Sequence, residues 1–521
     1  MPLSSIEHSL SYQVRRWLPH VLSTRASHRT AYVLSLLSAL TSGFISLVSL
    51  YSYPWKVRLN YTSWQINTIS SMASLGAYLV PPVLGILADN HGPITLSCLS
   101  IVGFIPSYSY LAYIFNHPEI SQTGSSFGVV VACFVVIGIS TSALYFSALL
   151  TCTKLYPQRK LLSISFPTTC IGISSLVGSQ ILKFKVFWYD DMSINETYLN
   201  LNVVFKCLAI LYVIIGLSAW VSTGTVSMIT YAEDLKQEAD LLEEESDTPT
   251  DAVYDVESFE AASLLHTSRS SISISSAMLA TTNYGTQKSD VATWEQPKSV
   301  FRDPTLYLLA ITMLLTLGPL EMFVTDMASL SNLILDSNKT TSSNTNTQNV
   351  PSTLLSIFAL SSTAARLTSG VISDYLLDHN LKLRRILLPL LVLTLVSQVL
   401  ILALTESSFL KGLSVKANIL ISGAVLGVSY GGLFTIYPTL VLTVWGQKSF
   451  GSAYGSLMVA PALGSVVSCM QYALIYDSRC VRNVVGTCIS AVYKFGTAQV
   501  LVAIVITCIM LKGWGKRGHQ A

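Results

Sequence analysis

Long stretches of apolar residues alternate with short polar segments along this chain. A helix needs about 20 apolar residues to cross the hydrocarbon layer of a bilayer. Twelve stretches reach about that length, six on each side of a long polar segment. They are residues 31–51, 67–88, 94–115, 127–150, 162–182, 204–223, 305–325, 351–373, 386–405, 417–442, 451–475 and 492–512. The pattern therefore predicts an all-α membrane protein with twelve transmembrane helices.

Composition supports this class and locates the one region that differs from it. Hydrophobic residues make up 51% of the 521 residues and charged residues only 11%, against about 25% in soluble domains. Residues 224–301 hold 14 of the 28 acidic residues but four basic ones, a net charge of −10, and the rest of the chain carries +13. We expect this segment to be a disordered acidic loop. No basic stripe with interleaved aromatic residues is present, so nucleic acid is not an expected partner.

One short motif occurs twice. Gly85-Ile-Leu-Ala-Asp89 and Gly370-Val-Ile-Ser-Asp374 each close the second apolar stretch of a block of six. Glycine and aspartate four residues apart fall on one face of a helix. The motifs stand 285 residues apart, and removing the 78-residue polar segment leaves 207, which suits one six-helix unit. The expected divisions are 1–30 (N-terminus), 31–223 (first bundle), 224–301 (loop), 302–512 (second bundle) and 513–521 (C-terminus).

The residues around the first motif carry a family resemblance. Tyr51-Ser-Tyr-Pro54, Tyr61-Thr-Ser-Trp-Gln-Ile-Asn67 and Leu75-Gly76 precede it, and Gly92-Pro93 follow it. This run resembles the major facilitator superfamily, and within it the nodulin-like, monocarboxylate-transporter-homologue branch found in fungi. The resemblance implies the major facilitator fold, in which two six-helix bundles face each other with a path between them. It also implies secondary active transport of a small solute by alternating access.

The same resemblance implies a cytoplasmic gate at Gly85, Asp89, Gly92, Gly370 and Asp374. The family aspartate that matches Asp89 interacts with the positive N-terminal end of a helix from the opposite bundle. The glycine at Gly85 would permit close helix approach. This chain departs from the pattern at Asn90, where arginine is common. The alternative is that Asp89 only ends a helix at a polar loop.

Three charged residues are candidates for substrate or proton binding, because a charge inside the membrane is costly and points to function. Glu321 is either a proton acceptor or cation ligand on the path, or an interfacial glutamate that reaches water, and Pro319 could break its helix. Arg366 resembles the carboxylate-binding arginine of animal monocarboxylate transporters, but Ser362 stands where they have aspartate. Arg366 would bind an anion or pair with Asp374. Lys56 loosely resembles a first-helix lysine of that family.

Three Asn-x-Ser/Thr glycosylation sites, at Asn60, Asn195 and Asn338, indicate the topology. All three fall in loops on one side if both termini are cytoplasmic. The short cytoplasmic segments then hold fourteen Lys and Arg residues against eleven on the other side, in agreement with the positive-inside rule. Cys480 and Cys488 fall in one non-cytoplasmic loop and could form a disulfide.

The polar segment also contains Glu260-Ala-Ala-Ser-Leu264-Leu265. This acidic residue, three-residue spacer and dileucine have the form of a cytosolic adaptor-binding signal and resemble a yeast vacuolar sorting signal, although six-residue patterns of this kind are common. We therefore expect the vacuolar membrane rather than the plasma membrane, and a vesicle-coat adaptor as a partner.

No nucleotide-binding Gly-x-x-x-x-Gly-Lys loop occurs, so this chain is not expected to use ATP. No His-rich or paired-carboxylate constellation suggests an enzyme, and neither a cofactor nor a metal is expected. The sequence predicts a transporter that works as a monomer, with a proton gradient as the simplest drive and small organic acids as the solutes that the resemblance implies. The rival hypothesis is a non-transporting nutrient receptor whose acidic loop signals to partners.

Overall fold

The computed structural model describes residues 5–21, 23–117, 124–191, 196–246, 300–337, 350–379, 383–405, 415–476 and 489–516. Within them, twelve helices are long and apolar enough to cross a membrane, and their spans overlap the twelve expected stretches one by one. The predicted all-α fold with twelve transmembrane helices is thus confirmed.

The first half consists mainly of helices, with one short hairpin. Its elements are α1 (Ser5–Val21), α2 (Thr24–Ser42), η1 (Gly43–Tyr51), α3 (Ser52–Leu59), α4 (Ser63–Leu79), α5 (Pro81–His91), α6 (Pro93–Asn116), α8 (Gly124–Leu155), η2 (Leu161–Ser165), α9 (Phe166–Ile181), η3 (Lys185–Phe187), β1 (Trp188–Asp191), β2 (Glu196–Leu199) and α10 (Leu201–Ser246). The strands pair antiparallel, with Trp188 opposite Leu199.

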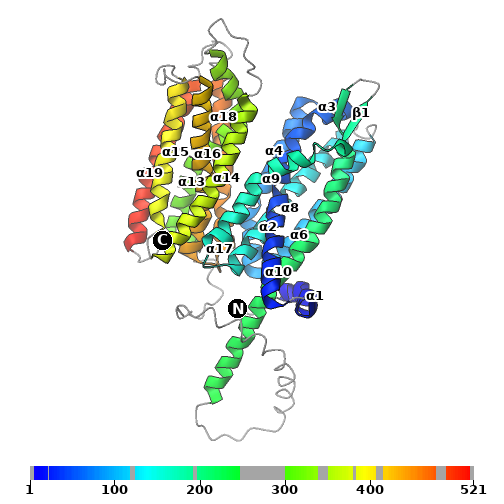
Figure 1. Cartoon of the computed structure of the whole chain (residues 1–521), viewed down its shortest axis with the longest axis vertical. Coiled ribbons are helices and arrows are strands. Elements are labelled where there is room, and N and C mark those ends of the chain that lie inside the picture. Colours follow the sequence, from blue (N-terminus) through cyan, green and yellow to red (C-terminus); the bar gives the residue numbers. More distant parts are fainter. Residues whose placement is uncertain are drawn as a thin grey trace.

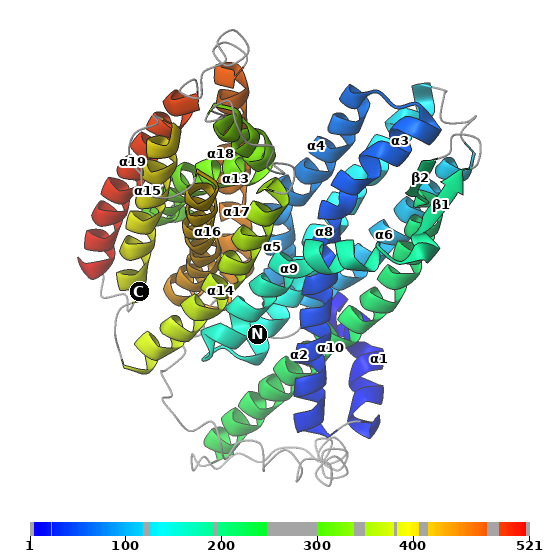
Figure 2. The same cartoon turned by 45° about the horizontal axis from the view of Figure 1, so that its top comes forward.

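The second half contains helices only, within the described residues. They are α13 (Pro304–Ser337), α14 (Val350–Asp378), α15 (Arg384–Thr405), α16 (Val415–Trp445), α17 (Phe450–Leu457), α18 (Val459–Ile475) and α19 (Ser490–Lys516). Figures 1 and 2 show the two halves as two bundles side by side, with α5, α9, α14 and α17 between them.

Each bundle has a buried interior of its own. In the first bundle, rings of Tyr51, Trp55, Phe134 and Phe205 meet edge to face at centroid distances of 5.3–5.7 Å. The interior of the second bundle continues into the first through Leu84, Ala88 and neighbouring apolar residues of α8. The bundles are therefore joined by apolar packing as well as by the polar contacts described below.

Two spans are built from two α-helices each. Pro81 begins α5 directly after the non-helical Val80, and this divides the second span into α4 and α5. The eleventh span is divided at Met458 into α17 and α18. Proline lacks the N–H that the preceding turn would bind, which explains the first break.

Two expectations are corrected. A break at Pro319 was expected, but α13 runs without interruption through it. Proline is tolerated in membrane helices because neighbouring groups satisfy the carbonyl it frees. The segment 224–301 was expected to be disordered, yet α10 continues from the sixth span to Ser246. The Leu, Ala, Glu and Lys residues in 231–246 favour helix, so acidity alone did not prevent it. Residues 247–299 lie outside the described residues.

Candidate functional site

The first contact between the bundles joins the C-terminal turn of α5 to the N-terminus of α17. The backbone N–H of Gly451 donates to Asp89 Oδ1 at 3.1 Å, and the N–H of Ser452 donates to Oδ2 at 2.6 Å. These amides have no partner within their own helix, and a carboxylate there is favoured by the helix dipole. We call the α5–α17 contact the first seam. Asp89 is not simply the end of a helix.

Glycine makes the first seam possible because the two backbones touch. A Cβ atom on Gly85 would overlap the carbonyl oxygen of Gly451, and one on Gly455 would overlap the carbonyl oxygen of Pro81. Gly92 has a different role. Its φ of +74° suits glycine alone, and a Cβ atom would overlap the carboxylate of Glu7.

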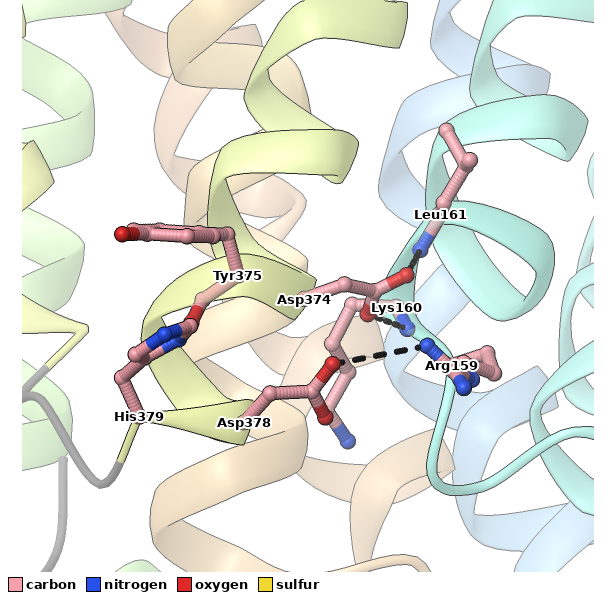
Figure 3. Close-up of polar contacts among 7 residues, drawn as sticks. All are labelled: Arg159, Lys160, Leu161, Asp374, Tyr375, Asp378 and His379. Carbon is pink, nitrogen blue, oxygen red and sulfur yellow. Dashed lines mark hydrogen bonds and ion pairs between the residues drawn. The ribbon is translucent and has the colours of Figure 1, made fainter.

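The second contact repeats the first with the bundles exchanged. Asp374, on α14 of the second bundle, accepts the backbone N–H of Lys160 at 2.5 Å and that of Leu161 at 3.2 Å (Figure 3). Leu161 begins η2, which leads into α9 of the first bundle. We call the contact of α14 with η2 and α9 the second seam. The end of the molecule at Asp89 and Asp374 is termed the gate end.

Charged side chains surround the second aspartate. Arg159 Nη1 lies 3.5 Å from Asp378 Oδ2, and both side chains are more than half exposed (Figure 3). The Lys160 ammonium donates to the carbonyl of Pro157 at 2.9 Å. Burial lowers the pKa of Lys160, and the charge of Asp374 opposes that shift. The sequence spacing of Asp374 from Arg384 and Arg385 did not decide its partner, and the structure shows that Asp374 binds backbone amides of the other bundle.

Arg366 lies on the same seam, two turns before Asp374. Its Nη1 donates to the carbonyl oxygen of Thr168 on α9 at 2.8 Å, and its guanidinium lies 5.6–5.8 Å from the ring centres of Tyr430 and Phe434. The side chain is 6% exposed. Its Nε has no hydrogen-bond partner among the described residues. The alternative that Arg366 pairs with Asp374 is wrong, because each binds different groups.

Glu321 belongs to the same group of side chains. The hydroxyl of Tyr430 donates to its Oε1 at 2.9 Å, and its carboxylate interacts electrostatically with Arg366. Glu321 is half-buried on α13 and turns toward α16. The structure thus brings Glu321 and Arg366 together through Tyr430, at the boundary with Thr168 of the first bundle.

Other sequence candidates lie elsewhere or outside the described part. Lys56 lies on α3, beyond the first span, and its side chain is not described. Asn60 is exposed at the end of α3, and Figure 1 shows α3 and β1 at the end opposite to α17. The remaining candidates fall outside the described residues: Asn195, Glu260, Leu264, Leu265, Asn338, Cys480 and Cys488.

Several residues of the site were missed. The amides at Lys160, Leu161, Gly451 and Ser452 act through the backbone, which carries no side-chain signal. Tyr430 could have been noticed as a polar aromatic within an apolar stretch, in Ser429-Tyr430-Gly-Gly432. The paired glycines of α17, Gly451 and Gly455, have the Gly-x-x-x-Gly spacing of close helix contacts.

Known proteins resemble this chain along nearly its whole length. "Probable transporter MCH1" of Saccharomyces cerevisiae is 49% identical over 521 residues, which cover 98% of each chain. The protein of the same name from Candida glabrata is 45% identical and covers 99% of each chain. Among solved structures, the proton:xylose symporter XylE has a TM-score of 0.58 at 13% identity and covers 92% of this chain and 95% of its own. The fucose:proton symporter FucP of E. coli has a TM-score of 0.54 at 12% identity and covers 94% and 99%.

The structural likeness supports the fold. The family model described as Major Facilitator Superfamily matches residues 31–469, which contain both motifs and nine whole spans, together with parts of the first and eleventh spans. This chain therefore belongs to the major facilitator superfamily.

Proposed function

We propose that this protein is a secondary active transporter that moves a small organic acid across the vacuolar membrane by alternating access. The observation that carries the proposal is the pair of seams at the gate end. In each, a single carboxylate binds the N-terminal amides of a helix in the opposite bundle. Such a contact contributes about 0.3–1 kcal/mol, and up to about 2 kcal/mol when partly buried. Bonds of this size can break and re-form during transport.

Arg366 is the proposed binding group for the solute. Its Nε–H is buried and without a partner among the described residues, and arginine binds carboxylates through two parallel N–H donors. Parting of the second seam also takes the Thr168 carbonyl away from Nη1. A bound carboxylate would replace that acceptor, which links solute binding to gate opening. A small monoanion suits a site with one arginine.

Glu321 is the proposed proton acceptor. While ionised, it compensates the charge of Arg366, to which Tyr430 connects it. Protonation of Glu321 leaves the arginine charge uncompensated, and this favours an anionic solute. Proton and anion would then bind together, as in symport.

The test is uptake into proteoliposomes that contain the purified protein, with a panel of short mono- and dicarboxylates and an imposed pH gradient. We expect saturable uptake that depends on the gradient, and Glu321→Gln should make uptake independent of pH while protein abundance is kept. Asp326→Asn, five residues further along α13, is the control. Saturable binding without flux would instead identify a nutrient receptor.

The membrane and orientation are part of the proposal. The exposed position of Asn60 at the end opposite the seams supports a non-cytoplasmic side for the sequons and a cytoplasmic gate end. The dileucine form at Glu260, Leu264 and Leu265 supports the vacuole through an adaptor. Microscopy of a tagged Leu264→Ala, Leu265→Ala variant tests this: we expect loss of vacuolar localisation, and unchanged localisation would remove the signal.

A further inference from the structure

The N-terminal helix α1 precedes the first span and has two distinct faces. Glu7, Ser11, Val14 and Leu18 are buried, at the spacing of a single helical stripe. The neighbouring stripe carries exposed apolar side chains, Ile6 and Trp17, which are 47% and 58% exposed. These two residues are eleven positions apart, so they lie three turns apart on one edge of the helix.

The buried stripe docks α1 against the end of the sixth membrane span. The hydroxyl of Ser227 donates to Glu7 Oε1 at 2.7 Å, and the indole N–H of Trp220 donates to the carbonyl of Leu10 at 3.1 Å. A Cβ atom on Gly224 would lie 2.9 Å from Val14 atoms. These three residues of α10 belong to the final turns of the sixth span. The docking therefore fixes α1 at the level where that span leaves the membrane.

The orientation of α1 also suits a helix at the membrane surface. In Figure 1 the membrane spans run upward, whereas α1 is strongly foreshortened beside α10. The turn to Figure 2 brings α1 into side view, still next to α10. The helix thus crosses the bundle axis, and it does so at a span end. A helix that crosses the span axis at a span end has the orientation of a helix that lies along a membrane surface.

The exposed charges of the N-terminal segment have one sign. Glu7 is its sole acidic residue in 1–30, and that carboxylate is buried against Gly92 and Ser227. Arg16 on α1 is exposed, as are Arg25 and Arg29 one turn apart on α2. Exposed aromatic and apolar residues beside arginines are typical of helices that lie in the headgroup region. The basic side chains would meet the phosphates and carboxylates of anionic lipids.

We propose that α1 is an interfacial helix that binds the anionic lipid surface on the gate side of the membrane. Ile6 and Trp17 enter the acyl boundary, and Arg16, Arg25 and Arg29 bind the headgroups. Because Glu7 also contacts Gly92, three residues after Asp89, the helix attaches the loop between α5 and α6 to the lipid surface. The inference does not depend on the transported solute.

The test is hydrogen exchange of residues 5–21 in the full chain, reconstituted in nanodiscs of phosphatidylcholine alone or mixed with phosphatidylserine. We expect slower exchange in the anionic discs, by up to about fivefold for each arginine that meets the surface, which corresponds to about 1 kcal/mol. High salt should remove the difference. Equal exchange in both discs would overturn the proposal.

A matched pair of variants tests whether the arginine side chains cause the lipid effect. Replacing Arg16, Arg25 and Arg29 by glutamine should abolish the difference between the discs, while Gln13→Ala, at an exposed uncharged position of α1, should retain it. A lipid effect that survives the triple replacement would contradict the proposal.

The depth of Trp17 in the lipid is measured on the folded protein with brominated lipids. The tryptophan fluorescence that is present in the unaltered chain and absent in Trp17→Phe comes from Trp17. This fluorescence should be quenched by bromine near the glycerol end of the acyl chain. An unquenched difference would show that Trp17 does not reach the lipid and would overturn the proposal.

Discussion

The two seams have the same plan but different contents. In the first, Asp89 and three glycines bring backbone against backbone. In the second, Asp374 binds an equivalent helix end, but Gly370 faces the Ser165 side chain and Arg366 occupies the next turn. The position that matches Arg366 in the first motif, four residues before its glycine, is Pro81. Both copies of the motif thus bind a helix end of the opposite bundle, while the buried arginine is present in the second copy alone.

We propose that the two seams have separate tasks. The first has the tighter backbone contact and no counterpart of Arg366, and under the proposed function it would serve as a mechanical closure. The second joins closure to a buried guanidinium and, through Tyr430, to Glu321. The following predictions test this division, from the largest expected effect to the smallest.

Arg366→Gln should have the largest effect on transport. Hydrogen bonds to a charged group are worth about 1.5–3 kcal/mol, so we expect about 10- to 150-fold loss of uptake at subsaturating solute. Pro81→Ala, its counterpart in the first seam, leaves Pro82 in place and should change uptake by less than about fivefold. The measurement is the initial uptake rate of each variant, divided by the amount of folded protein. Equal losses in both variants would mean that the second seam has no special role.

Gly85→Ala should come next. The new methyl group would overlap a backbone carbonyl, which no rotamer change can relieve, and overpacking costs about 1–3 kcal/mol. Closure of the gate end should weaken by about 5- to 150-fold. Gly370→Ala should do less, because the overlap is with the Oγ and Cβ atoms of Ser165 and not with backbone: Oγ can rotate away, and a smaller shift then suffices for Cβ. The control is Gly128→Ala, whose methyl group meets no atom within 4 Å. The rate at which a thiol reagent modifies cysteines introduced at the gate end would measure how far that end is closed. A larger effect of Gly370→Ala than of Gly85→Ala would contradict the prediction.

Asp89→Asn and Asp374→Asn should have similar, smaller effects. The amide retains one acceptor oxygen but loses its charge and one of two hydrogen bonds, which we expect to cost up to about 2 kcal/mol. Turnover should fall up to about 30-fold while abundance stays nearly unchanged. Turnover and detergent-extracted protein would be measured together. Loss of the folded protein in either variant would indicate a purely structural aspartate.

Arg159→Gln should have the smallest effect. The Arg159–Asp378 pair is exposed on both sides, and such pairs contribute about 0–1 kcal/mol. Uptake should change by less than about fivefold. A loss as large as that of Arg366→Gln would move the essential charge to the surface of the second seam.

The sequence predicted the twelve spans and the duplicated motif because both are patterns of side-chain polarity. It pointed to Arg366 and Glu321 because buried charges are rare in membrane helices. It did not predict the partners of Asp374 or Arg366, which are backbone groups about 200 residues away in the chain. The amphipathic α1 was missed because residues 5–21 contain no apolar stretch long enough to cross a membrane. The division between α17 and α18 was missed because Met458, where it occurs, is itself an ordinary apolar residue and not a proline.

The central claim is that transport requires the gate end to open. Cysteines in place of Arg159 and Asp378, in a chain without its native cysteines, allow a short bifunctional thiol reagent to link the bundles across the second seam. We predict that linking abolishes uptake into proteoliposomes, that cleavage of the linker restores it, and that the single-cysteine variants are unaffected by the reagent. Full uptake by the linked protein would contradict the claim.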